Sequence, residues 1–465
     1  MEKQERSSFS SRVGFVLAAA GSAVGLGNLW RFPYLAARYG GGIFLLVYLI
    51  LVVTFGFSLM ITEFAIGRKT KLSCIGAYGA LDKRFSFLGW IAAFVPLIIT
   101  PYYCVIGGWV MKYLWTFISG GALEAADNGG FFSRFISFDA GSLPATMLNF
   151  SGPTPWFVLF VLITGLVVIF GVQKGIENAS RLMMPVLAVL IVVIALYSLT
   201  IPGALAGLKY YLMPDFSQFS ASTVLGACGQ MFYSMSLAMG ITITYGSYMP
   251  KENLLEHSVT QIEIFDTLFA FFAGLMIIPS VIAFNGGDPS QVNSGPSLMF
   301  ISLPMVFDSM KFGTVIGAVF FLLVLFAALT SSIALMETLA SVIMDKFKLK
   351  RIPATLIIIA VCLVVGMLSC LGYGPWESVT IIGMQFLDFF DFLTNSVMMP
   401  IAAITICLLV SRVIGVKAVE EEVMHGEAAF RRKKIFNFMI KYLCPVFAAI
   451  ILLSSVANAF GLISM

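Results

Sequence analysis

A short stretch near the start of the chain, GSAVGLGNLWRFP from Gly21 to Pro33, places glycines and an asparagine between two apolar runs. A helix crossing a membrane should be regular here, and the glycines predict that it is interrupted. Backbone N–H and C=O groups left unpaired in lipid are costly, so an interruption persists only where it lines a polar cavity. Free carbonyls can bind a cation, and free N–H groups at the start of a half-helix can bind a carboxylate. The stretch therefore predicts a binding site for a small ion or a carboxylate.

A second apolar segment, LGACGQMFYSMSLAMGITITYGSY, is interrupted in the same way between Ser234 and Gly240. Interrupted helices at matching places in two halves of a chain indicate a transporter site near the middle of the bilayer. The alternative is that these glycines only let helices pack closely. That alternative explains a single glycine more readily than two breaks at equivalent places.

The elements that position these breaks are membrane-spanning helices. The 465 residues are 59% apolar and 11% charged, whereas soluble chains carry about 25% charged residues. Apolar runs of about 18 residues or more predict spanning helices, and such runs recur along the whole chain. We therefore expect an all-α polytopic membrane protein with one transmembrane domain over residues 1–465. The first apolar run contains glycines and lacks a small-residue cleavage site, so it is not a cleavable signal peptide.

Eleven spans are expected, at roughly 12–36, 43–68, 87–117, 155–172, 179–201, 223–247, 257–284, 313–344, 352–372, 381–411 and 434–463. The two breaks then fall in spans 1 and 6, and each opens a block of five. The blocks cover about 12–201 and 223–411, and an extra helix follows them.

Charge sets the orientation. With the N-terminus in the cytoplasm, all but six of the 28 lysines and arginines face inward, as the positive-inside rule requires. The six are Arg31, Arg38, Lys112, Arg134, Lys209 and Lys311. We expect a plasma (inner) membrane protein whose C-terminus lies outside and whose largest outer loop is 118–154. The positive charge thus indicates orientation rather than nucleic-acid binding.

Several classes of function lack residues to support them. The seven cysteines lie mostly in apolar runs without metal-ligand spacing, and the two histidines are far apart in the sequence. No phosphate-binding glycine loop is present. The sequence therefore favours neither an enzyme nor an ATP-driven pump, and no span offers the continuous polar face of an open channel.

Four motifs together resemble those of the neurotransmitter:sodium symporter family, the group with the LeuT fold, in its bacterial eleven-helix subset. GSAVGLGNLWRFP resembles the family's helix 1, GQMFYSMSLAMG its helix 6, LFAALTSSIALME its helix 8 and PLIITPYY its helix 3. The resemblance covers nearly the whole chain. It implies a 5+5 inverted repeat with helices 1 and 6 unwound at mid-membrane. It also implies sodium-coupled import of an amino acid by alternating access.

The resemblance further implies two sodium ions. The first would be bound by the carbonyl of Ala23, the side chains of Asn28, Ser234 and Asp266, and the substrate's carboxylate. The second would be bound by the carbonyls of Gly21, Val24 and Ala327 and the hydroxyls of Thr330 and Ser331. Hard oxygen ligands of this kind suit a hard cation. Read alone, the hydroxyls of 330–332 are also explained as helix-interior groups bonded to their own backbone.

Gly25 stands where amine-transporting members carry an aspartate, so the resemblance implies a substrate with its own carboxylate. Its ammonium would meet the carbonyls of Ala23, Tyr233 and Ser234 and the hydroxyl of Ser236. Its carboxylate would meet the first sodium ion, N–H groups near Leu26 and Gly27, and the hydroxyl of Tyr103. The side-chain pocket would consist of Ser22, Ile99, Tyr233, Met239, Ser331 and Leu335.

That pocket is mostly apolar, and methionine adapts to varied shapes. We therefore expect large hydrophobic or aromatic L-amino acids, although Met239 is also explained by ordinary helix packing. Ala238 departs from the glycine usual at this break, which leaves fine specificity open.

Intramembrane acids are costly and indicate function by default. Asp266 lies in an apolar helix where chloride-dependent relatives are neutral, so the resemblance implies chloride independence; a purely structural acid is the alternative. Glu63 is expected to be structural, bonding the unwound part of helix 6. The expected outer gate is Arg31 with Asp391, under which Tyr233 forms a lid. The expected inner gate is Arg6 with Asp345, near Ser247 and Tyr248, although Arg6 is also explained as one of many cytoplasmic cations.

An alternative from another class is a membrane sensor that binds amino acids without moving them. A sensor would be expected to carry a sizeable cytoplasmic domain, and the largest inner segment, 412–433, is short. Proton coupling is a variant of the symporter hypothesis, and Thr330 with Ser331 argues against it. The mechanism requires no oligomer.

Overall fold

A computed structural model describes residues 7–288, 292–293, 295–460 and 462. Over these residues the chain forms a helical bundle, and its only β pairings are two isolated bridges, Gly41 with Pro214 and Ile381 with Met384. The all-α architecture expected from the apolar runs is thus confirmed.

Eight helical runs within the described chain are long and apolar enough to cross a membrane. They are Gly42–Thr70, Lys83–Ile118, Val172–Ser198, Leu255–Phe284, Gly313–Phe347, Arg351–Leu371, Phe386–Val413 and Lys433–Ala459. A bent pair, α1 (Arg12–Ala23) and Gly27–Arg38, turns by 52° at its break and adds a ninth. The two remaining expected spans are 155–172, which coincides with α10 (Thr154–Ile169), and 223–247, which coincides with the pair α13 (Ala221–Ser234) and α14 (Ile241–Tyr248). Every expected span therefore overlaps a helical run.

Some expected boundaries differ from the structure. The tenth span begins at Phe386 rather than 381, because Ile382 and Gly383 turn with positive φ angles of 54° and 73° between the paired Ile381 and Met384. The expected outer loop 118–154 contains three short helices, α7 (Ala122–Ala125), α8 (Gly130–Ile136) and α9 (Leu143–Leu148). These turns depend on local polar contacts, which hydropathy alone does not register.

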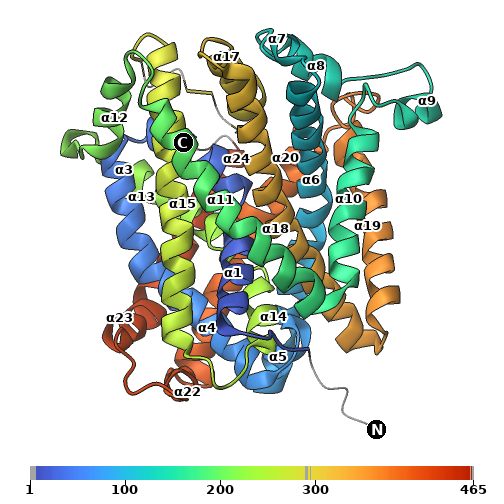
Figure 1. Cartoon of the computed structure of the whole chain (residues 1–465). Helices are drawn as coiled ribbons and strands as arrows, with labels where there is room; N and C mark the ends of the chain where they lie inside the picture. The colour runs from blue at the N-terminus through green and yellow to red at the C-terminus, as the bar shows by residue number, and fades with distance from the viewer. Residues whose placement is uncertain (1–6, 289–291, 294, 461, 463–465) are drawn as a thin grey trace.

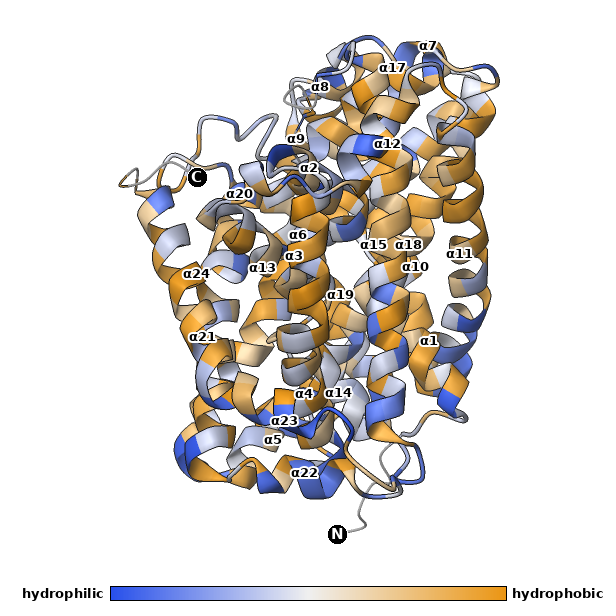
Figure 2. Ribbon diagram, turned by 90° about the vertical axis from the view of Figure 1, so that its left-hand side faces the viewer, coloured by the Kyte–Doolittle hydropathy of each residue, from blue (hydrophilic) through white to orange (hydrophobic). Residues whose placement is uncertain are grey.

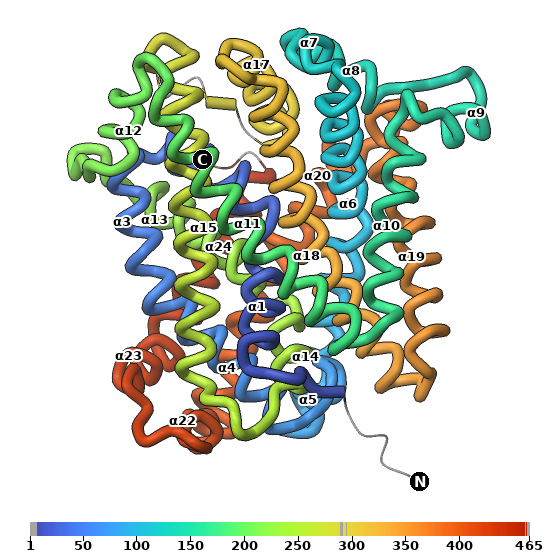
Figure 3. Tube along the Cα trace, viewed as in Figure 1, coloured from blue at the N-terminus to red at the C-terminus, as the bar shows by residue number. Residues whose placement is uncertain are grey.

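The broken helix α1 lies in the middle of the bundle (Figure 1). It packs against α11 (Asn178–Ser198), α15 (Leu255–Phe284) and α18 (Gly313–Phe347). The long helix α18 also packs along α6 (Ser86–Ile118), and α14 packs against α4 (Phe57–Thr70). Apolar residues dominate the middle of the helices, and polar residues gather near the ends, most clearly around α22 (Lys417–Val423) and α23 (Lys433–Phe438) (Figure 2). Tracing the chain shows that α1 starts at the end where α22 and α23 lie (Figure 3).

Buried charges hold that end together. The Arg68 side chain is fully buried; its Nε lies 2.6 Å from Glu422 Oε1, and its Nη1 donates to the Asn253 carbonyl over 2.8 Å. Glu256 accepts from the backbone N–H groups that lead into α23, and Glu427 accepts from the Glu256 N–H over 2.7 Å. The expected short inner segment 412–433 is therefore bound tightly to α4 and α15.

Candidate functional site

The two helix breaks face each other across a small central cavity of about 30 Å³. Every residue expected at the substrate lines it, together with Asn28 and Ile241. The lining residues are Ser22, Ala23, Gly25, Leu26, Gly27, Asn28, Ile99, Tyr103, Tyr233, Ser234, Ser236, Met239, Ile241, Ser331 and Leu335. Sequence reasoning missed Ile241, whose only signal is that it follows Gly240 at the start of the inner half-helix.

The first break has little free space. The backbone of Val24 is extended (φ −69°, ψ 102°), and the Gly25 N–H donates to Asn28 Oδ1 over 3.3 Å. A Cβ atom on Gly25 would lie 2.6 Å from Ser331 Oγ, so this position leaves no room for an aspartate side chain in this arrangement. The Leu26 N–H donates to the Tyr103 hydroxyl over 3.2 Å, which places an N–H group and a hydroxyl together at the cavity.

In the second break, Ser236, Ala238 and Gly240 all have positive φ angles, of 53°, 60° and 75°. At a non-glycine residue this left-handed conformation costs about 1–2 kcal/mol. Glu63 offsets that cost: it is fully buried, accepts from the Ala238 N–H over 3.0 Å and also accepts from the Thr242 hydroxyl. Ala238 therefore adopts the conformation that glycine would favour, and Glu63 bonds the unwound backbone as expected.

Three of the residues expected at the first sodium ion, Asn28, Ser234 and Asp266, meet in one hydrogen-bonded group. Asn28 Nδ2 donates to Asp266 Oδ1 over 2.8 Å, and the Ser234 hydroxyl lies 2.8 and 2.9 Å from the two Asp266 oxygens. Ala23, whose carbonyl is also expected at this ion, lines the adjoining cavity. The Tyr48 hydroxyl, not anticipated from the sequence, lies 3.4 Å from Asp266 Oδ2.

Asp266 is fully buried, and no lysine or arginine of the described chain forms a salt bridge with it. An uncompensated carboxylate in such a place is costly. The oxygen-rich surroundings match the donor set that a hard cation prefers.

The residues expected at the second sodium ion also converge. Ser331 Oγ, on α18, lies 3.4 Å from the Gly21 carbonyl oxygen and 3.2 Å from that of Val24, both at the first break. Thr330 Oγ1 lies 3.0 Å from the Ala327 carbonyl oxygen and also bonds its own helix at Phe326. A helix-interior role thus accounts for Thr330 but not for Ser331, which reaches across to α1.

The expected outer pair is not formed in this structure. The Arg31 guanidinium lies over the Tyr233 ring, 5.4 Å from its centroid. Asp391 Oδ1 instead accepts from the Tyr102 hydroxyl over 3.1 Å and from Asn395 Nδ2 over 2.6 Å. A cavity of about 150 Å³, lined by Arg31, Tyr233 and Asn395 among others, lies beside them. Arg31 and Asp391 thus form no salt bridge in this conformation, and their pairing when the outer gate closes stays a prediction.

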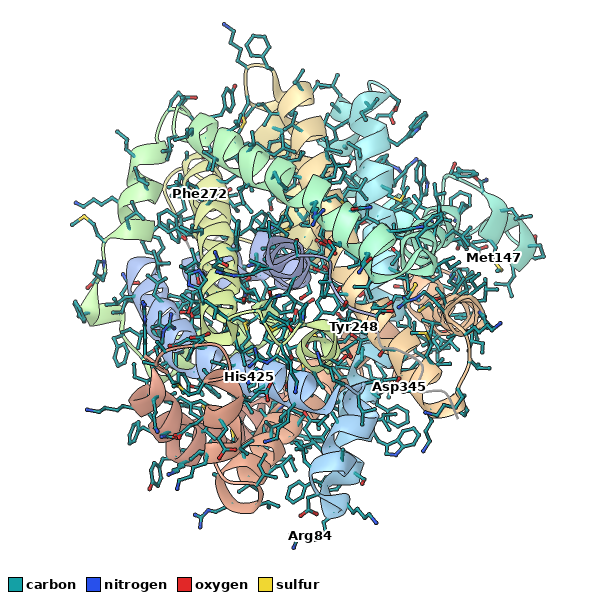
Figure 4. The ribbon with its side chains drawn as sticks, turned by 60° about the horizontal axis from the view of Figure 1, so that its bottom comes forward. Arg84, Met147, Tyr248, Phe272, Asp345 and His425 are labelled. Carbon is teal, nitrogen blue, oxygen red and sulfur yellow. The ribbon has the colours of Figure 1, made fainter. Side chains whose placement is uncertain are left out.

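Of the expected inner gate, Arg6 lies outside the described residues. Asp345 Oδ2 accepts from the Ser73 N–H over 2.7 Å, and the Ser247 hydroxyl donates to the Thr244 carbonyl over 2.5 Å. The Tyr248 carbonyl accepts from the Phe9 N–H over 3.2 Å, so the segment before α1 is docked against α14. Tyr248 and Asp345 are both visible in the view tilted toward the lower end of the bundle (Figure 4).

Two buried acids at this end were not singled out from the sequence. Glu337 is fully buried; it accepts from the Tyr248 hydroxyl over 2.7 Å and forms a salt bridge of 2.5 Å with Arg351. Glu177, in the run that leads into α11, accepts from Ser10 N over 2.8 Å and from Arg181 Nη2 over 2.7 Å. The rule that acids inside apolar helices indicate function was a signal available for Glu337, whereas Glu177 lies in a polar stretch between two expected spans and gave no such signal.

Two helices broken opposite one another, with hydroxyl, carbonyl and carboxylate oxygens gathered at the gap, define a membrane transporter of the LeuT fold. A solved structure, MhsT in complex with L-phenylalanine, shares this fold with a TM-score of 0.86 and 36% identity, and the match covers 97% of this chain and 100% of that one. The model of the sodium:neurotransmitter symporter family matches residues 6–122 and 131–462. The chain belongs to that family, as its four motifs had indicated.

Curated relatives agree with this assignment. An uncharacterized sodium-dependent transporter of Bacillus subtilis, YhdH, is 34% identical over all of both chains. One from Haemophilus influenzae is 31% identical over 97% of this chain and 98% of its own. The creatine transporter of Torpedo marmorata is more distant, at 27% identity over 78% of this chain and 65% of its own. The chain is therefore a sodium-coupled multi-pass membrane transporter.

Proposed function

We propose that this transporter imports large hydrophobic or aromatic L-amino acids together with two sodium ions and without chloride. The observation that carries the proposal is the Asp266 carboxylate, buried without a cationic side chain and bonded to Asn28 and Ser234 beside the central cavity. A cation bound there would be neutralised by Asp266 and completed by the substrate's carboxylate. Each ligand would then favour binding of the other.

The walls of the cavity support the substrate class. Ile99, Met239, Ile241 and Leu335 supply apolar surface, and the lining contains no lysine, arginine, aspartate or glutamate. A charged substrate side chain would therefore lack a partner. The N–H of Leu26 and the hydroxyl of Tyr103 lie together, where they could bind the substrate's carboxylate. The complex of MhsT with L-phenylalanine is consistent with a substrate of this kind.

The second ion would join α1 to α18. On the α1 side its ligands would be the carbonyls of Gly21 and Val24, and on the α18 side the carbonyl of Ala327 and the hydroxyls of Thr330 and Ser331. Sodium bound there would fix the broken helix against α18. Its release would free the lower part of α1, which is one half of an alternating-access cycle. The docked segment around Phe9, together with Glu177 and Glu337, would close the site on the N-terminal side.

The membrane arrangement is part of the proposal. The N-terminus would lie in the cytoplasm of the cell and the C-terminus outside, in the plasma membrane, as the distribution of lysine and arginine indicates. The outer gate would close by bringing Arg31 from Tyr233 to Asp391. Both residues are half-buried rather than enclosed, and ion pairs that are open to solvent form and break at little net cost.

Uptake of radiolabelled phenylalanine, tyrosine, leucine and glycine into proteoliposomes tests the proposal, with and without an inward sodium gradient. Chloride is replaced by gluconate in a parallel series. We expect sodium-dependent accumulation of the large amino acids that gluconate does not reduce. Binding without accumulation would indicate a sensor, accumulation driven by a proton gradient would contradict the sodium sites, and preference for glycine would contradict the pocket.

A further inference from the structure

A segment between the expected spans carries an apolar surface that an extramembrane loop does not need. It comprises α12 (Ala204–Leu212) and the residues that follow it to Phe219. One face of α12, formed by Ala204, Gly207 and Tyr211, is buried. The other side exposes Leu205, Leu212, Met213, Phe216 and Phe219, of which Phe216 is 69% exposed. Exposed polar residues, Lys209, Asp215, Ser217 and Gln218, lie among these apolar ones, so the segment has the mixed surface of a boundary between water and an apolar phase.

Contacts with α15 fix how far the segment descends. Gly203 lies beside Ala283 near the end of α15, and Gly207 lies close to Pro279. The Tyr211 hydroxyl donates to the Phe271 carbonyl over 3.1 Å. The helix α12 therefore runs antiparallel to α15 along its upper part, from the C-terminal end of that candidate span toward its middle.

Contacts with the start of α3 (Gly42–Leu51) set the level of the lower tip of the segment, the turn around Pro214 that follows α12. Pro214 pairs with Gly41 in an isolated antiparallel bridge, directly before α3 begins. The Tyr210 hydroxyl donates to the Ala37 carbonyl over 2.6 Å, in the last turns of α2 (Phe32–Arg38). The span Gly42–Thr70 starts at this level, so the tip lies where that span enters the membrane.

The tip also overhangs the flank of the bundle. Figures 1 and 3 both show α12 projecting sideways beyond the upper end of α3, at the end of the molecule opposite the start of α1. Below it, Leu46, Ile50 and Val53 are exposed at helical spacing along α3 and the turn after it, with Ile50 55% exposed. This exposed apolar stripe belongs to a candidate membrane span, and the exposed apolar residues that follow α12 lie near its upper end.

We propose that residues 210–219 form an interfacial anchor that inserts Leu212, Met213, Phe216 and Phe219 into the lipid leaflet farther from the N-terminus. Aromatic and aliphatic side chains at the boundary between headgroups and acyl chains are typical of such anchors. Asp215 is exposed, and its carboxylate accepts from Ser217 N over 3.0 Å; the anchor requires this charge to lie in the headgroup layer. Since Tyr210 bonds Ala37, the anchor ties the upper half of the broken first span to that leaflet.

Nitroxide labels placed at single introduced cysteines test the anchor in lipid nanodiscs. All seven native cysteines are buried, so a cysteine in place of Phe216 or Phe219 is the preferred site of labelling. Collision rates with oxygen, which partitions into lipid, and with a water-soluble nickel chelate report depth. Labels at Ile50 provide the reference for a position in lipid. Labels at Leu205 provide the reference for a position nearer to water, about 10 Å above Leu212 along α12.

We expect labels at 216 and 219 to favour oxygen over the nickel chelate several-fold relative to the label at 205, and to approach the label at 50. Nickel accessibility at 216 and 219 equal to that at 205 would overturn the anchor. Dipolar broadening between labels at 216 in liposomes, growing with the protein-to-lipid ratio, would instead place a second copy of the chain on this surface and also overturn it.

Discussion

Asn28 and Asp266 are 238 residues apart in the chain, and Asn28 Nδ2 lies 2.8 Å from Asp266 Oδ1 in the middle of the bundle. The other amide atom, Asn28 Oδ1, accepts from the Gly25 N–H, so the orientation of the amide is fixed from both sides. This contact joins the first helix break to α15 and gathers the oxygen atoms that we propose bind the first sodium ion.

Replacing Asp266 by asparagine keeps the shape of the side chain and removes its charge. We expect sodium-driven uptake without chloride to fall about tenfold or more, equivalent to about 1.4 kcal/mol, and chloride to restore part of it. The readout is uptake per folded protein in chloride and in gluconate. Glu263→Gln is the matched control: this acid lies one turn earlier on α15 and is paired with Arg432 over 2.7 Å. It should not create a response to chloride, and unaltered uptake by Asp266→Asn would contradict the charge argument.

Ser331→Ala removes the hydroxyl that reaches from α18 to α1, and Thr330→Ala removes its neighbour. We expect the sodium concentration for half-maximal uptake to rise about tenfold in the double variant, since two ion ligands are lost. The control is Ser332→Ala, which removes an equally buried hydroxyl that contacts Thr164 over 3.0 Å, away from the break. If the sodium curves of the double variant and the control coincide, the second sodium site does not exist as proposed.

Met239→Phe adds a rigid ring to a cavity of about 30 Å³. We expect uptake of aromatic amino acids to decline more than that of leucine, because the ring takes up space that aromatic substrates need. Competition between labelled leucine and unlabelled amino acids gives the ranking. Met231→Phe is a control at a buried methionine of α13 that does not line the cavity. It should lower activity without reordering the ranking, and an unchanged ranking for Met239→Phe would remove Met239 from the pocket.

Arg68→Ala leaves the Glu422 side chain, which is only 12% exposed, without its cationic partner. Removing one member of a buried ion pair costs roughly 3–5 kcal/mol, so we expect a marked fall in melting temperature in detergent. Arg84→Ala breaks a comparable pair with Asp82 in which Arg84 is 77% exposed, and it should leave the melting temperature unchanged. Equal melting temperatures for Arg68→Ala and Arg84→Ala would show that α22 does not stabilise this end of the bundle.

Much of the fold could be predicted because its signals are local. Each expected span overlaps a helical run, and the break near Gly25 was visible as glycines inside an apolar segment. The departures lie where local signals are weak. The turn at Ile382 and Gly383 and the short helices of the 118–154 loop are fixed by a few polar contacts. Likewise, α12 is too short to register as a span, although its exposed side carries Leu205 and Leu212.

The candidate site also combines residues that could be predicted with contacts that could not. The motifs and the family resemblance supplied the residues that line the cavity, apart from Ile241. The resemblance also suggested an ion pair between Arg31 and Asp391, which this conformation does not contain. Pair contacts of this kind change with the conformation of the helices, so a motif can name the partners without fixing whether they touch.

By itself, the sequence determined that this chain spans a membrane, where its helices break and to which family it belongs. Those properties follow from composition, from backbone hydrogen bonding in lipid and from short motifs, all of which act over neighbouring residues. The family resemblance had already grouped Asp266 with Asn28 and Ser331 with Gly21 and Val24, and the tertiary structure supplied the contacts between them. Only the tertiary structure decided that Glu337 joins Tyr248 to Arg351 and that α12 overhangs α3. These contacts join residues distant in the chain, and their formation depends on how whole helices pack, which no local pattern encodes.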